Sequence, residues 1–465
     1  LTGLFLGTSY IPFYPWAIFF VWVPLWVLWL KNPTYKKILF TGVLATFTFN
    51  LIGFHWIAFT AREFGHLPWI VSIFILMIFA AFSALHVPAS GLLWLYFQKK
   101  YSFRTVESIW ILCVIYWVFE TLWPMIFPWN MGYPWLWAHW PGVQWADVIG
   151  FQGLSFITVT INAFFTWWIL STRVMAQKVK ILGSALALFA IFHGMGYLKS
   201  RSLLPADKTL KILSVQANIG NLEKAYAEKG MAYQGYIVDQ YLELAKEALS
   251  KYPKPDLLAF PETALPIALD REYSATPQNM KLSHFLQQNN VALITGSYSE
   301  PMPDKKTYNS VFLLSEKGDI VGTYNKTMLL AFGEYLPGGE VFPILYQWLP
   351  FVSHFSSGLG PGTIQWNDVV FGIQVCYEGL YPAFTTKLVD MNTQIIYNAT
   401  NDSWFGKTFE PQQHLYMTAA RALEYRRPLV RVTNTGITTA VLPDGSFLEA
   451  SPIYEKWYSL FEIPY

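Results

Sequence analysis

The feature that most constrains this chain is a series of long apolar runs in its first 200 residues. A helix that crosses a membrane needs about 20 mostly apolar residues, and several runs approach or reach that length. They are Trp16–Leu30, Ile38–Phe59, Pro68–Phe97, Val106–Phe127, Ile149–Leu170 and Ile181–Leu198. Leu1–Tyr10 is interpreted as the end of a further, incomplete helix. Residues 1–200 are therefore predicted to form a transmembrane helical domain of about seven spans, with a tilt or kink near Pro88.

Lys and Arg residues cluster in alternate short loops between these runs. The clusters are Lys31, Lys36 and Lys37, then Lys99, Lys100 and Arg104, then Arg173, Lys178 and Lys180. Short basic loops stay on the cytoplasmic side of a membrane. Counting helices onward from them, the polar part of the chain after Leu198 is expected on the extracytoplasmic side.

Residues 209–460 have mixed composition and predict a separate domain. Strand-like and helix-like patterns alternate along this part, which favours an α/β domain with two packed sheets or one large one. The net charge is only +2 and no long basic run occurs, so no nucleic-acid partner is expected. The only cysteines, Cys113 and Cys376, lie in different halves of the chain, which argues against a disulfide and a zinc site. No metal or nucleotide cofactor is expected.

Polar residues follow three of the predicted strands. Glu262 follows LLAFP, Lys326 follows VGTYN and Cys376 follows GIQV. Strand ends of α/β proteins meet at one edge of the fold, where active sites are commonly found. A carboxylate could take the thiol proton, and an ammonium could stabilise the oxyanion of acyl transfer.

Each of these residues also has an ordinary structural interpretation. A lone cysteine is more often a small buried side chain than a nucleophile. Glu262 could be a solvated turn residue and Lys326 a surface cation. Spacing alone does not decide between these possibilities.

Whole motifs carry more information than the spacing. FPETALP, YNKTMLLAFGEYLP, VCYEGLYP and NATNDSWFGKTFEPQQHLYMTAARALEYRRPLVRVTNTG occur in this order, and FPWNMGY occurs at Phe127–Tyr133. Together they resemble the nitrilase (carbon-nitrogen hydrolase) superfamily. With the apolar half, they resemble its bacterial membrane-bound branch, the apolipoprotein N-acyltransferases. The resemblance implies an α-β-β-α sandwich joined to transmembrane helices.

The resemblance also implies roles for individual residues. Glu262 matches the general base, Lys326 the catalytic lysine and Cys376 the acylated nucleophile. Supporting positions are matched by Glu334, beside the lysine, and by Tyr377 and Glu378, beside the nucleophile, with the Tyr377 N–H as an oxyanion donor. Asn309, Asn398 and Trp404 match substrate-pocket positions. A tryptophan expected near the start of the domain is replaced by Ala225 or Tyr226, and a final transmembrane helix is not found before Tyr465.

The reaction implied by the resemblance has two steps. Cys376 takes a fatty acyl chain from a phospholipid as a thioester, and the acyl group then passes to the α-amino group of an S-diacylglyceryl-cysteine on an apolipoprotein. The expected location is the bacterial inner membrane, with the catalytic domain in the periplasm. A membrane-anchored nitrilase-type amidase, which would pass the acyl group to water, is the alternative enzyme. A transporter or receptor is a third possibility, but the few intramembrane charges disfavour transport.

One apolar segment separates the Glu334 motif from Cys376. Val341–Gly360 contains Trp348 and Phe351 among several large apolar residues, with almost no charge. One interpretation is a loop packed into the domain core. The other is a mobile lid that enters the membrane interface and guides the acyl chain, because a soluble surface rarely tolerates such a patch without a partner. On the second interpretation Trp348 contacts substrate.

Overall fold

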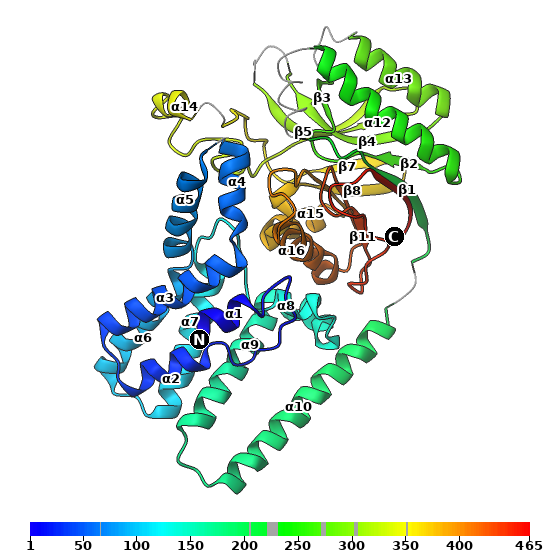
Figure 1. The fold of residues 1–465 in the computed structure, drawn as a ribbon. Coiled ribbons are helices and arrows are strands. Elements are labelled where there is room, and N and C mark those ends of the chain that lie inside the picture. Colours follow the sequence, from blue (N-terminus) through cyan, green and yellow to red (C-terminus); the bar gives the residue numbers. More distant parts are fainter. Residues whose placement is uncertain (66, 204–205, 221–230, 271–275, 302–305, 350–351) are drawn as a thin grey trace. The chain divides into compact units, whose positions relative to one another are not determined.

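The computed structural model describes residues 1–65, 67–203, 206–220, 231–270, 276–301, 306–349 and 352–465. The chain forms two compact units (Figure 1). Unit 1 comprises Leu1–Leu203 with Thr408–Ala420, and unit 2 comprises Leu204–Lys407 with Arg421–Tyr465. The predicted domain bounds, 1–200 and 209–460, stay predictions. The assignment of residues 408–420 to unit 1 was not predicted.

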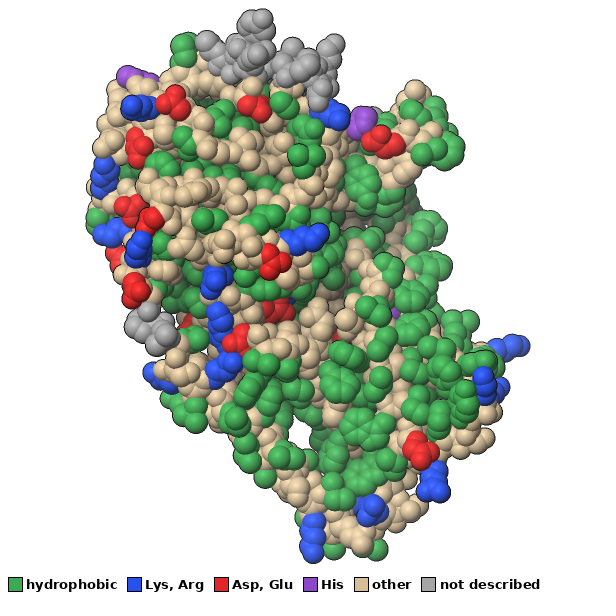
Figure 2. All heavy atoms as spheres, turned by 180° about the vertical axis from the view of Figure 1, so that it is seen from behind, with side chains coloured by type: hydrophobic (Ala, Val, Ile, Leu, Met, Phe, Trp, Pro, Cys, Tyr) green, Lys and Arg blue, Asp and Glu red, His purple; other side chains and the backbone are tan. Residues whose placement is uncertain are grey.

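Unit 1 is built almost entirely of helices. Its elements are α1 (Thr2–Gly7), α2 (Val23–Lys31), α3 (Tyr35–Gly53), α4 (Trp56–Gly65), α5 (Trp69–Phe82), α6 (His86–Tyr101), α7 (Thr105–Leu122), α8 (Tyr133–Trp137), η1 (Pro141–Trp145), α9 (Ala146–Leu170) and α10 (Met175–Arg201). Among the described residues, four helical stretches are long and apolar enough to cross a membrane. The bent pair α3–α4 makes a fifth if it is one span. Figure 2 shows hydrophobic side chains over much of this unit's surface, as expected of a surface in contact with lipid. The total of about seven spans stays a prediction.

Proline residues explain two departures from the predicted spans. Trp16–Leu30 is helical only from Val23, because Pro24 lacks the N–H with which a helix from further upstream would continue. Pro68–Phe97 is interrupted between Phe82 and His86. There Pro88 cannot donate a hydrogen bond to the carbonyl four residues before it. The kink expected near Pro88 is therefore present as a break between α5 and α6.

Unit 2 contains two β-sheets. The first has the order β12-β1-β2-β4-β5-β6, with β3 also paired to β4, and the second has the order β11-β10-β9-β8-β7. The strands of the first sheet are β1 (Thr209–Gln216), β2 (Leu257–Ala259), β3 (Leu265–Ala268), β4 (Ala292–Ser299), β5 (Tyr308–Leu314), β6 (Ile320–Asn325) and β12 (Trp457–Pro464). Those of the second are β7 (Thr363–Trp366), β8 (Val369–Val375), β9 (Ile395–Thr400), β10 (Leu429–Thr433) and β11 (Thr439–Val441).

The two sheets pack face to face, with helices outside them. Tyr397 on β9 donates from its hydroxyl to the carbonyl of Phe260, after β2, at 2.5 Å. Helices α12 (Met231–Lys251) and α13 (Pro277–Asn289) form a buried apolar core with the first sheet. Helix α15 (Pro382–Asp390) packs against β8 of the second sheet. The predicted α-β-β-α sandwich is confirmed.

The first and last strands of unit 2 are neighbours. β1 and β12 pair antiparallel along their full length, from Thr209 opposite Pro464 to Gln216 opposite Trp457. β5 and β6 form a hairpin about Gly318, since they pair antiparallel on either side of it.

Candidate active site

The three residues predicted as a catalytic triad come from three strand ends and meet inside unit 2. Glu262 follows β2, Lys326 follows β6 and Cys376 follows β8. Each is buried, with no more than 6% of its surface exposed. The Lys326 ammonium donates to Glu262 Oε1 at 3.1 Å and to the Glu334 carboxylate at 2.8 Å. The lysine is therefore held between two carboxylates.

A side-chain amide fixes the same two carboxylates. Asn309 Nδ2 donates to Glu262 Oε1 at 2.7 Å and to Glu334 Oε1 at 2.8 Å. Asn309 was predicted as a substrate-pocket residue, which stays a prediction. In the structure its amide binds both carboxylates. Glu262 Oε2 accepts from the backbone N–H of Asn401 at 2.9 Å. Asn401 was not predicted, because a backbone donor depends on the path of the folded chain and leaves no signal in residue type.

The charges around Lys326 keep it cationic. Burial alone would lower the pKa of its ammonium, but the carboxylates of Glu262 and Glu334 outweigh this and raise the pKa well above its usual range. A permanent cation at this point can stabilise negative charge that develops on a reacting carbonyl oxygen.

Cys376 has an unusual backbone conformation. Its φ is +55°, in the left-handed region that residues other than glycine rarely adopt. Such conformations persist when the surrounding contacts enforce them, and they concentrate at functional sites. Burial raises the pKa of the thiol well above its ordinary value of 9.0, and the Glu262 carboxylate adds to this, while Lys326 opposes it. The resting thiol is therefore protonated at neutral pH, and it needs a base to act as a nucleophile.

The Glu378 side chain joins the two loops of the site. Its Oε1 accepts from the backbone N–H groups of Thr327 at 2.7 Å and Met328 at 3.0 Å, directly after the lysine. Its Oε2 accepts from the N–H of Val375 at 2.8 Å, directly before the cysteine. The Tyr324 hydroxyl also donates to Oε1, at 2.8 Å. Glu378 thus fixes the backbone next to both Lys326 and Cys376.

Burial has a strong effect on the Glu378 carboxyl. The side chain is fully buried, and burial raises its pKa from 4.5 to about 7, although the backbone donors and Lys326 act in the opposite direction. Its charge therefore changes near neutral pH.

The remaining predicted residues are placed differently from one another. Tyr377 is buried, with its ring 6.1 Å from that of Phe405. Trp404 is half-buried. Asn398 is fully buried on β9, where its Nδ2 donates to the carbonyl of Cys376 at 3.3 Å. Their substrate contacts, and the oxyanion role of the Tyr377 N–H, stay predictions. Ala225, Tyr226 and Phe351 lie outside the described residues.

The apolar segment between Glu334 and Cys376 is exposed on unit 2. Val341, Phe342 and Trp348 have exposed fractions of 72%, 61% and 70%. Trp348 ends the short helix α14 (Ile344–Trp348), which has no buried residue. These exposed side chains argue against a loop packed into the domain core, and the lid stays a prediction. We call residues 341–348 the exposed apolar arm.

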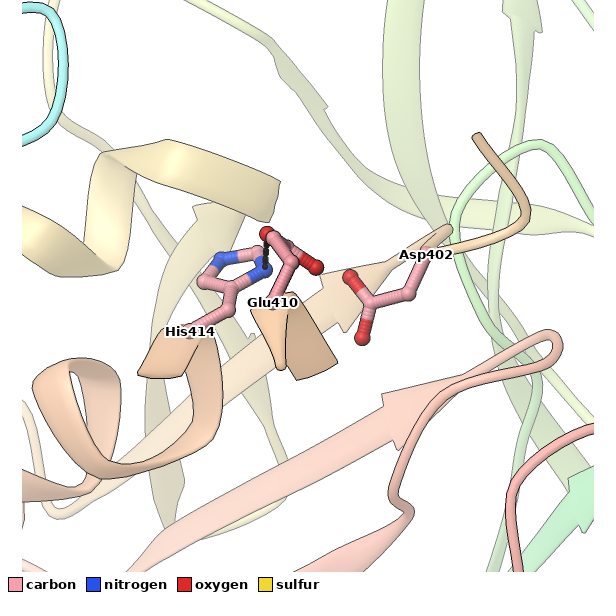
Figure 3. A group of neighbouring side chains, drawn as sticks. All are labelled: Asp402, Glu410 and His414. Atoms are coloured by element: carbon pink, nitrogen blue, oxygen red, sulfur yellow. Dashed lines mark ion pairs between the residues drawn. The ribbon is translucent and has the colours of Figure 1, made fainter. Parts of the chain in front are cut away.

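Asp402 and Glu410 are two further acidic residues that lie near the site in the sequence. Asp402 Oδ2 is ion-paired with Arg431 Nη2 at 2.9 Å, and both side chains are fully buried. Glu410 and His414 face each other on successive turns of helix α16 (Glu410–Tyr425), with His414 Nδ1 3.5 Å from Glu410 Oε1 (Figure 3). Each of these two buried acidic side chains therefore has a partner, which offsets the cost of burying its charge.

Comparison with known proteins adds independent information. The carbon-nitrogen hydrolase family matches residues 211–463, and the apolipoprotein N-acyltransferase N-terminal domain matches residues 2–164. An apolipoprotein N-acyltransferase of Bdellovibrio bacteriovorus is 44% identical over 476 residues, covering 100% of this chain and 87% of that protein. Proteins of the same name from Geobacter metallireducens and Haemophilus influenzae are 30% and 28% identical, covering 86% and 97% of this chain and 76% and 85% of theirs.

These matches extend over both units and include every motif quoted from the sequence. The buried Glu–Lys–Cys arrangement lies within the residues matched by the carbon-nitrogen hydrolase family. The chain therefore belongs to the apolipoprotein N-acyltransferase family, the membrane-bound branch of the carbon-nitrogen hydrolases.

Proposed function

We propose that this protein transfers a fatty acyl chain from a phospholipid to the α-amino group of an S-diacylglyceryl-cysteine on an apolipoprotein, through a thioester on Cys376. The observation that carries the proposal is the Lys326 ammonium held between Glu262 and Glu334 in a buried site with a cysteine in a left-handed conformation. The relatives named above support the identity of the acceptor.

In the first step, Glu262 takes the proton of the Cys376 thiol as the sulfur attacks the ester carbonyl of the phospholipid. The Lys326 ammonium faces the negative charge that forms on the carbonyl oxygen. When the tetrahedral intermediate collapses, the carbon–oxygen bond breaks, and the departing lysophospholipid alcohol takes the proton from Glu262. The product is an acylated cysteine and a free base.

In the second step, the amine of the acceptor attacks the thioester carbonyl. Glu262 takes a proton from the amine, the carbon–sulfur bond breaks, and the proton passes to the cysteine sulfur. One base therefore serves both halves of a ping-pong reaction. Because all three triad side chains are buried, water has little access to the thioester, which favours transfer to an amine over hydrolysis.

The exposed apolar arm supports a lipid substrate. Val341, Phe342 and Trp348 present apolar surface that a bilayer interface would bury. In this proposal unit 2 lies on the periplasmic side of the bacterial inner membrane, and the arm meets the membrane where the acyl donor resides.

A labelled acyl donor tests the proposal against the alternatives. Purified protein is mixed with phospholipid carrying a radiolabelled acyl chain, without acceptor, and the label on the protein is followed. We expect a thioester that persists until a diacylglyceryl lipopeptide is added and then moves to its amino group, with Cys376→Ala as the unlabelled control. Release of free fatty acid instead would identify a hydrolase, and absence of label on the wild-type protein would contradict both enzymes.

A further inference from the structure

The unusual conformation of Cys376 raises the question of what enforces it. The residue lies directly after β8, so the sheet fixes its backbone only on one side. Its carbonyl oxygen accepts from Asn398 Nδ2 at 3.3 Å. Asn398 belongs to β9, which runs parallel to β8, with Gln374 opposite Asn398 in the register. This hydrogen bond therefore joins β9 to Cys376, two residues beyond the position opposite Asn398.

Asn398 is itself held by the next strand. Arg431 on β10 lies opposite Asn398 in the parallel register. Its Nη1 donates to Asn398 Oδ1 at 2.8 Å, and the Thr400 hydroxyl donates to the same oxygen at 2.9 Å. Because both donors bind the oxygen, the amide can only present its NH₂ group to the Cys376 carbonyl.

The guanidinium is fixed in turn by Asp402. Arg431 Nη2 donates to Asp402 Oδ2 at 2.9 Å, and Asn398, Arg431 and Asp402 have no exposed surface. Gly436 allows this close arrangement, since a Cβ there would lie 2.0 Å from Asp402 Oδ2. A buried charged pair with several hydrogen bonds has few alternative positions, which makes it a rigid support.

Asn398 lies on the face of the sheet away from the other sheet. Tyr397 beside it reaches the carbonyl of Phe260 in the first sheet, and successive side chains of a strand point to opposite faces. The Asn398 side chain is fully buried. A buried side chain on this face is placed to support the backbone of Cys376.

We infer that Asn398, oriented by the Arg431–Asp402 pair, is a positioning residue that holds the Cys376 carbonyl and thereby the left-handed conformation in which the sulfur faces Glu262 and Lys326. The inference rests on the proposed use of Cys376 as the nucleophile. It predicts that loss of the amide donor lowers the rate of acylation without weakening substrate binding.

Two substitutions separate the donor from the rest of the side chain. Asn398→Asp keeps an oxygen for Arg431 but loses the donor to Cys376. Asn398→Leu keeps the approximate volume and loses both contacts. Gln374→Met is the matched control, because Gln374 is the fully buried amide opposite Asn398 in the same row, and its Nε2 donates to Thr385 instead. Thermal unfolding checks that all three proteins are folded.

The readout is the burst of p-nitrophenol from a short-chain p-nitrophenyl ester, which reports acylation of Cys376 alone. Both Asn398 variants should lower the burst rate at saturating ester about ten-fold or more, with a half-saturating ester concentration within about two-fold of wild type. Gln374→Met should match wild type. A wild type that gives a burst but takes no acyl chain from phospholipid would contradict the proposed function, while the variants still test this inference.

Three outcomes would overturn the inference. One is a normal burst rate in either Asn398 variant. Another is a raised half-saturating concentration with an unchanged maximal rate, which would make Asn398 a substrate contact. The third is an equal loss in Gln374→Met, which would indicate general loosening of the sheet.

Discussion

The backbone N–H of Thr327 donates to Oε1 of Glu378 at 2.7 Å, so the loop that carries the lysine is bound to the turn that carries the cysteine. The same carboxylate binds the N–H of Val375 through its other oxygen. Lys326 and Cys376 follow strands of different sheets, β6 and β8. Their separation therefore depends on one side chain as well as on the packing of the sheets.

Glu378→Gln should remove a pH dependence of stability. The folded carboxyl has a pKa of about 7, raised from 4.5, so the folded state holds this proton more tightly than the unfolded chain does. Its stabilising contribution is complete below pH 4.5 and is lost as the pH rises through about 7. Across this window wild type should lose up to about 3 kcal/mol relative to Glu378→Gln. Thermal unfolding of both proteins from pH 4.5 to 8 measures this, and parallel curves would contradict the prediction.

Glu262→Gln should change two reactions of Cys376 in opposite directions. The carboxylate raises the pKa of the thiol, so its removal lowers that pKa and increases the thiolate present at neutral pH. Alkylation by iodoacetamide should therefore become faster. Acylation and transfer should slow about 10²–10⁴-fold, because the base for both steps is lost. Mass spectrometry follows both reactions, with Cys376→Ala as the blank. Slower alkylation in Glu262→Gln would show that the carboxylate assists that reaction as a base too.

Lys326→Met should reduce both activity and stability. The substitution leaves the buried Glu262 and the half-buried Glu334 without their shared cation, which costs about 3–5 kcal/mol. Loss of the charge facing the oxyanion should lower acylation about 10²–10³-fold. Restoration of stability by the further change Glu334→Gln would identify the unpaired carboxylates as the cause, and a wild-type melting temperature in Lys326→Met would exclude it.

Changing Trp348 and Phe342 together to Ser should slow the turnover of a membrane-bound substrate but not that of a soluble one. Both side chains are exposed, so thermal stability should not change. Each apolar side chain moved into a bilayer contributes about 1.5–3 kcal/mol, so turnover of phospholipid in vesicles should fall at least about ten-fold. A short soluble ester should be turned over as in wild type. Tyr236→Ser with Met280→Ser is the control, since these exposed residues lie on α12 and α13. Equal loss with both substrates, together with earlier melting, would make the arm part of the core.

Cysteine-accessibility labelling tests the orientation. Single cysteines in the loops at 31–37, 99–104 and 173–180 should react only from the cytoplasmic side, because these loops carry the basic clusters. A cysteine at Gln234 in unit 2 should react only from the outside. Labelling of the Gln234 position from the cytoplasm would reverse the assignment. Lys305, a second position suited to this scan, lies outside the described residues.

The sequence could predict site residues that carry a reactive side chain and lie in a recognisable motif. Glu262, Lys326 and Cys376 could be singled out by the motifs that contain them, because their positions after strands did not by themselves decide between a catalytic and a structural role. Their hydrogen-bond partners could not be predicted in the same way. Asn401 contributes a backbone N–H to Glu262, and Asn398 links Arg431 to the carbonyl of Cys376. Both arrangements depend on strand order and register.

The membrane unit shows the converse limit. Apolar runs indicate spans, but single proline residues decide where a helix can start, as Pro24 does for α2. The assignment of residues 408–420 to unit 1 depends on contacts such as those of Gln413, whose Nε2 donates to the carbonyls of Ile11 and Gly53. No local pattern in the sequence announces hydrogen bonds between segments some 360 to 400 positions apart along the chain.

The pairing of β1 with β12 governs the order in which unit 2 can be assembled during synthesis. Thr209 has its partner Pro464 at the far end of the unit. During synthesis the chain emerges from the ribosome with its N-terminus first, at roughly 5–20 residues per second. The edge of the first sheet therefore stays open until Trp457–Pro464 emerges, and the nascent unit exposes an unpaired strand throughout that interval. The first sheet is therefore complete only after β12 has paired with β1, and a chaperone that shields strand edges would act before that pairing.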